Sequence, residues 1–143
     1  MTSDNGLMPQ GRSSAALRAI LRLFCIIPLL TGLGDLIHGV GFLSAAGAQV
    51  PAESLTNAVL NSHLMFAGAI WFGYAPLIWY ATNNLSERIP LLRILFSLIF
   101  LSGLGRLFAF YLYGSPGTVL VGAMAIELLL PPIIVIWSAR ANE

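Results

Sequence analysis

The chain has 143 residues, of which 57% are apolar and only 9% are charged. Ordinary soluble domains carry about 25% charged residues, so this composition excludes an ordinary soluble domain and indicates a polytopic membrane protein. Seven arginines, with no lysine, and six acidic residues give a net charge of +1, so the chain has no basic face of the kind that binds nucleic acids.

Four long apolar segments follow one another, separated by short polar connections. The chain opens with polar residues that lack periodicity, so we expect a mobile cytoplasmic tail over residues 1–18. Each apolar segment has about 20–25 residues, enough to cross a hydrocarbon core of about 30 Å. The sequence therefore predicts an all-α, up-down bundle, a four-transmembrane-helix domain over residues 19–138 with helices at about 19–43, 61–80, 90–113 and 118–137.

The first apolar segment also has features of a secretion signal, because Ala46-Gly47-Ala48 resembles a cleavage site. The apolar run at 23–43 is longer than the roughly 7–15 residues of a signal's apolar region. It also contains Asp35 and His38. We therefore interpret the segment as a transmembrane helix.

The arginines give the orientation. The loops at 44–60 and 114–117 contain neither arginine nor lysine. On the opposite side of a four-pass arrangement lie Arg12, Arg18, Arg22, Arg88, Arg93 and Arg140. The positive-inside rule then places both termini in the cytoplasm.

Small residues are frequent in the apolar segments. Glycines 32, 34, 39 and 41 lie in the first segment, while Ala69/Gly73 and Gly105/Ala109 form small-xxx-small pairs in the second and third. Such pairs permit close helix approach, so we expect helix contacts there.

Arg106 and Glu127 interrupt the last two apolar segments at matching positions. A charge at the helix centre costs about 2.5–3.5 kcal/mol on insertion scales, so such residues face the bundle interior and find partners. Arg106 lies 8 positions before Gly114, and Glu127 lies 10 positions after Gly117. Both therefore sit about 12–15 Å below the intervening turn, which predicts an ion pair. The pair either sets the register of two helices or belongs to a functional site.

The same counting places more polar side chains near this depth. Asp35 lies 8 residues before Leu43, and His38 shares its face as the i+3 neighbour. The resulting candidate pocket, in the outer half of the membrane, consists of Asp35, His38, His63, Ser102, Arg106, Tyr113 and Glu127.

Structural alternatives exist for several of these residues. Asp35 and His38 can bond each other within one helix, His63 can contact headgroups, and Tyr113 can belong to an aromatic belt. The two histidines leave haem ligation open as a less favoured alternative, and their spacing matches no metal motif. No known catalytic motif identifies a substrate, so the sequence leaves open whether the protein is an enzyme.

Three motifs in order resemble a bacterial four-helix membrane family catalogued only as a domain of unknown function (four-three-four-five). The resemblance covers roughly residues 20–138. The first motif is Asn61-Ser62-His63, and the second is Gly103-Leu104-Gly105-Arg106 followed by Gly114-Ser115-Pro116. The third is Glu127 followed by Pro131-Pro132. Where the family commonly has an Arg after the Ser-His position, this chain has Leu64 and Met65. The resemblance implies a bacterial inner-membrane protein and the Arg and Glu positions, and it implies no activity.

Three functions compete at this point. The first is binding of a small apolar or amphipathic molecule in the pocket, with an isomerase-like reaction on a lipid-soluble substrate as one form. The second is a non-catalytic accessory or assembly subunit of a membrane complex. The third, a proton-coupled transporter, requires a homo-oligomer because four helices without an internal repeat are few for transport. All three have the lipid bilayer as a partner.

Overall fold

The computed structural model describes residues 10–140, with side chains from 14 to 139, and in this part all regular elements are helices. They are α1 Gln10–Phe24, α2 Ile26–His38, α3 Val40–Ala45, the short 3-10 turn η1 Ala52–Ser54, α4 Ala58–Asn83, α5 Leu85–Tyr113 and α6 Thr118–Arg140. Four stretches are long and apolar enough to cross a membrane, namely Ser14–His38, Ala58–Asn83, Leu85–Tyr113 and Thr118–Ala139. The predicted all-α, four-helix membrane bundle is confirmed.

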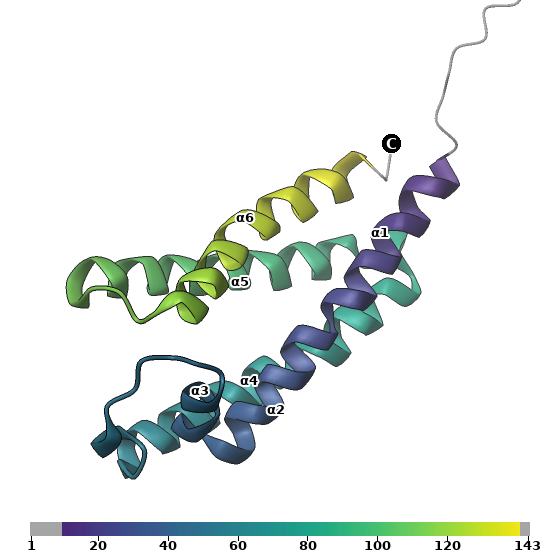
Figure 1. Ribbon diagram of the computed structural model, residues 1–143. Coiled ribbons are helices and arrows are strands. Elements are labelled where there is room, and N and C mark those ends of the chain that lie inside the picture. Colours follow the sequence, from purple (N-terminus) through teal and green to yellow (C-terminus); the bar gives the residue numbers. More distant parts are fainter. Residues whose placement is uncertain (1–9, 141–143) are drawn as a thin grey trace, which may run out of the picture.

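The helices pack as two antiparallel pairs (Figure 1). Helices α1 and α2 form one nearly continuous rod along α4, while α5 and α6 form the second pair. The start of α1 and the end of α6 lie at one end of the bundle, here called the termini end. The α3–α4 connection and the α5–α6 turn lie at the opposite end, here called the loop end. If all four stretches cross a membrane, the start of α1 and the end of α6 lie on the same side of it.

The best-packed part of the bundle lies toward the termini end, where both helix pairs meet. Leu17 and Leu21 of α1, Ile78 of α4 and Phe96 of α5 have no exposed surface, and the rings of Phe24 and Phe96 are 5.5 Å apart. Lipid tails are as apolar as leucine, so close van der Waals packing holds these helices together in the membrane. Toward the loop end the two pairs diverge (Figure 1).

The first transmembrane segment differs from the single helix predicted at 19–43. Helix α1 already begins at Gln10, inside the predicted tail, because Leu17 and Leu21 lie on one face and are buried against the bundle. The rest of the predicted tail, residues 1–9, lies outside the described residues. At the other end the helix stops at His38, and Gly39 has a φ of +52°, a conformation that favours glycine.

Asn61 of α4 holds the break between α2 and α3. Its Oδ1 accepts a hydrogen bond from Val40 N at 3.0 Å, and its Nδ2 donates to Leu55 O and Asn57 O, each at 3.0 Å. The freed backbone N–H of Val40 thus has a partner, as the membrane interior requires.

The remaining helices are longer than their apolar runs. Helix α4 begins three residues before the predicted 61, because the Asn57 side chain accepts a hydrogen bond from Leu60 N at 3.0 Å and so caps it. Helix α5 begins at Leu85 instead of 90, so Pro90 lies inside it. Helix α6 continues through Pro131 and Pro132, although proline inside a helix removes a hydrogen bond and ordinarily kinks or breaks it.

The closest helix approaches occur at other glycines than the expected pairs. A Cβ added to Gly32 would lie 2.4 Å from Phe72 N, and one added to Gly68 would lie 2.7 Å from Leu36 N. A Cβ on Gly73 or Gly105 would meet nothing within 4 Å. The prediction of close helix contacts at Gly73 and Gly105 is therefore wrong. Helices α2 and α4 instead approach each other closely at Gly32 and Gly68.

Candidate functional site

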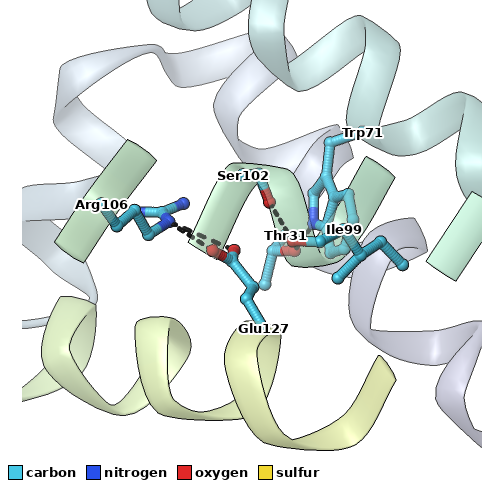
Figure 2. A network of polar contacts seen from close by, with 6 residues as sticks. All are labelled: Thr31, Trp71, Ile99, Ser102, Arg106 and Glu127. Atoms are coloured by element: carbon cyan, nitrogen blue, oxygen red, sulfur yellow. Dashed lines mark hydrogen bonds and ion pairs between the residues drawn. The ribbon is translucent and has the colours of Figure 1, made fainter. Parts of the chain in front are cut away.

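Arg106 and Glu127 form the predicted ion pair. Arg106 Nε donates to both carboxylate oxygens of Glu127, at 2.9 Å to Oε2 and 3.1 Å to Oε1. The Glu127 side chain is 11% exposed and the Arg106 side chain 44% exposed, so the pair is buried on its acidic side and open on its basic side. Figure 2 shows Glu127 pointing from α6 toward Arg106 of α5.

Two small residues of α5 position the carboxylate. A Cβ on Gly103 would lie 3.0 Å from Glu127 Cβ, so the glycine lets α6 approach closely there. Ser102 donates its hydroxyl proton to Ile99 O at 2.7 Å, and it also interacts electrostatically with Glu127.

Asp35 of α2 lies on the other helix pair and adds a second carboxylate. It packs against α4, since a Cβ on Gly68 would lie 2.7 Å from Asp35 Cβ. Its Oδ1 is buried and has no hydrogen-bond partner. Arg106 is close enough to Asp35 to interact with it electrostatically, and no hydrogen bond joins the two. The region around Arg106 therefore includes two carboxylates and one guanidinium.

The sequence analysis missed a polar contact one turn from Asp35. Trp71 Nε1 of α4 donates to Thr31 Oγ1 at 2.8 Å (Figure 2). Thr31 in turn donates to Ile27 O at 2.7 Å. Thr31 and Asp35 are i and i+4 on α2, so they share a helix face. That spacing is the signal by which the sequence could have indicated Thr31.

The histidines stand apart from these contacts. His38 and His63 are both exposed, and neither bonds to any residue in the described part of the chain. The intrahelical Asp35–His38 bond is not formed. Within residues 14–139, no three His, Cys, Asp or Glu side chains gather as a metal site requires.

A pocket of about 260 Å³ lies between the loop ends of α5 and α6. Arg106 and Tyr113 line it, while the other candidates (Asp35, His38, His63, Ser102 and Glu127) are not among its walls. The remaining lining residues are mostly apolar and consist of Ala109, Phe110, Gly114, Pro116, Leu120 and Met124. Tyr113 is 86% exposed at the mouth.

The pocket combines apolar walls with one strong donor group. Glu127 accepts hydrogen bonds only from Nε of Arg106. The two terminal nitrogens of the Arg106 guanidinium donate to none of the described residues. A guanidinium presents several N–H donors in a fixed plane that suits carboxylate or phosphate oxygens. The arrangement can therefore hold a molecule that has an oxygen acceptor and an apolar body.

Comparison with known proteins identifies the family but no activity. No curated protein and no solved structure matches the chain. A family model described as "Domain of unknown function (DUF4345)" matches residues 16–138, which include both members of the ion pair and all but the outermost residues of the four apolar stretches. The chain is a membrane protein that belongs to this DUF4345 family.

Proposed function

We propose that this protein binds a small amphipathic molecule in the pocket at the loop ends of α5 and α6. The observation that carries the proposal is the state of Arg106: Glu127 accepts a hydrogen bond from its Nε, and Arg106 lines a pocket whose walls are mostly apolar. Intramembrane charges are expensive and mark functional sites by default. A half-exposed arginine held in place by a buried carboxylate is suited to recognising a polar head.

The size of the pocket limits the ligand. Its volume of about 260 Å³ lies just below the roughly 300–1,000 Å³ of typical ligand sites. A small lipid-soluble molecule, or the end of a longer one, fits this space. Its head would accept hydrogen bonds from Arg106, and its apolar part would contact Phe110, Leu120 and Met124.

Binding, rather than catalysis, is the function proposed. An isomerase-like proton transfer needs a carboxyl group that is not held by an ion pair, and Asp35 is the candidate. Asp35 does not line the pocket, so a ligand there would not reach it directly. If no ligand binds, the accessory-subunit function becomes the better explanation of the ion pair.

The location follows from charge and family. We propose the bacterial inner membrane, with the termini end in the cytoplasm, because the loops at 46–57 and 114–117 carry no arginine. The pocket would then open toward the outer side.

A photoactivatable fatty acid in nanodiscs containing the full chain tests the binding. Its carboxylate supplies the acceptor and its diazirine-bearing chain labels the walls. We expect labelling to concentrate at residues 109–124 and to fall by at least about tenfold in Ala109→Trp, which fills the pocket; tenfold corresponds to about 1.4 kcal/mol. Arg106→Gln should weaken labelling in the same way.

Leu112→Trp is the matched control, because Leu112 is exposed on the same helix and does not line the pocket. It should label like the unaltered protein. Labelling spread evenly over all lipid-facing helices, and unchanged by Ala109→Trp, would contradict the proposal. An unlabelled fatty acid should also compete better than the alcohol of equal chain length.

A further inference from the structure

A second charged feature lies at the termini end, far along the helices from the pocket. Arg18 and Arg22 are one turn apart on α1 and so share a helix face. That face meets the last turn of α4, where Arg22 contacts Thr82 and Asn83. Two like charges at this spacing repel each other, so their placement needs an explanation.

Arg22 is fixed in one orientation. Its Nε donates to Thr82 Oγ1 at 3.1 Å and its Nη2 donates to Asn83 Oδ1 at 3.2 Å. The guanidinium also lies 4.8 Å from the ring centroid of Trp79. Thr82 is itself fully buried and bonds Trp79 O at 2.7 Å. The group is therefore preorganised, and its Nη1 has no partner among the described residues.

Arg18 has no such partners in the described part of the chain. Its Nε is buried and makes no hydrogen bond, and within residues 14–139 neither arginine pairs with a carboxylate. A buried donor on a charged group without a partner is unfavourable. The carbonyl end of α4 favours nearby cations, but its partial charge is small compared with two guanidinium groups.

The surroundings are those of a membrane interface. Trp79 and Tyr80 are both about half exposed at this level, and exposed Trp and Tyr side chains typically meet lipid headgroups. Toward the membrane centre, α1 and α2 present apolar side chains outward: Leu23 is 68% exposed and Ile26 is 47% exposed. A headgroup at the arginines would leave its acyl chains against this apolar surface.

We propose that Arg18 and Arg22 together bind the phosphate of an anionic phospholipid in the leaflet at the termini end. One phosphate between the two guanidinium groups would supply acceptors for Arg18 and for the remaining Nη1 of Arg22. It would also neutralise the like charges. The apolar strip at Leu23 and Ile26 favours a lipid over a free phosphate ion as the occupant.

Native mass spectrometry of the full chain tests the proposal, after exposure to equimolar phosphatidylglycerol and phosphatidylcholine in detergent. The unaltered protein should retain phosphatidylglycerol preferentially. Arg18→Gln should lower this preference about fivefold, since one arginine near anionic lipid contributes about 1 kcal/mol. Arg22→Gln should lower it similarly.

Arg93→Gln is the control, because Arg93 is an exposed arginine on α5 and should leave the preference unchanged. Arg22→Gln also removes bonds to α4, so the Arg18 variant is decisive: Arg18 makes no bond to a described residue whose loss could unfold the protein. A wild-type preference in Arg18→Gln would overturn the proposal. Loss of the preference in millimolar inorganic phosphate would also overturn it, by indicating a free-anion site.

Discussion

At the scale of single residues, Arg106 and Glu127 are the most informative pair. The carboxylate is almost completely buried, and its two oxygens share one Nε–H donor. Removing one partner leaves the other charge without its counterion in a medium of low dielectric constant. Removing both leaves two polar but neutral groups, which is the less unfavourable state.

We therefore expect Arg106→Gln and Glu127→Gln to be non-additive. Each single change should lower the free energy of unfolding by about 1.5–3 kcal/mol, the range for hydrogen bonds to charged groups. The double variant should lose clearly less than the sum. Thermal unfolding in detergent measures all four proteins, and strictly additive losses would mean that the two side chains do not interact in the membrane.

At the scale of elements, glycines decide how α2 and α4 cross. Gly68 lies against the backbone of α2, and a Cβ there would be 2.7 Å from Leu36 N, an atom that cannot move without displacing the helix. Gly105 faces open space. Both are in helices with ordinary backbone angles, so they differ only in their surroundings.

Gly68→Ala and Gly105→Ala should consequently have opposite effects. Overpacking at residue 68 should lower stability by about 1–3 kcal/mol. At residue 105 alanine should raise stability by about 0.5–1 kcal/mol, because glycine is the poorer helix former. Melting temperatures in one detergent compare the two, and a stabilised Gly68→Ala would show that the crossing is looser than described.

The break between α2 and α3 depends on one side chain of α4. Asn61→Ala removes the acceptor of Val40 N and two further hydrogen bonds, so it should destabilise the protein by about 1–3 kcal/mol. His63→Ala, two residues along the same helix, is exposed and should change stability by less than about 0.5 kcal/mol. If the two changes lowered stability equally, the hydrogen bonds of Asn61 would not be what stabilises the break between α2 and α3.

At the scale of the whole molecule, the termini end and the loop end differ in structure. The termini end contains the tightly packed cluster around Phe96, and the loop end contains the ion pair and the pocket. The two connections at the loop end touch, since a Cβ on Gly117 would lie 3.5 Å from Gln49 N. The chain thus closes the bundle at the end where its helix pairs diverge.

Reporter fusions test the proposed orientation. A reporter joined after residue 48 should be active outside the cytoplasm, and one joined after residue 143 should be active inside it. Three of the four candidate spans lie between the two junctions, and an odd number of crossings puts them on opposite sides of the membrane. Paired reporters with opposite compartment requirements make each fusion its own control. Both junctions on one side would refute the topology.

The sequence by itself determined the class of protein, its four apolar helices and the meeting of Arg106 with Glu127. These follow from composition, segment length and counting residues from a turn, which are properties of the linear chain. The tertiary structure decided which faces meet: Gly32 and Gly68 at the crossing, Trp71 on Thr31, and His38 and His63 turned outward. Helices α4, α5 and α6 are apolar on nearly all sides, so their sequences contain almost no amphipathic pattern that would fix the rotation of each helix about its axis.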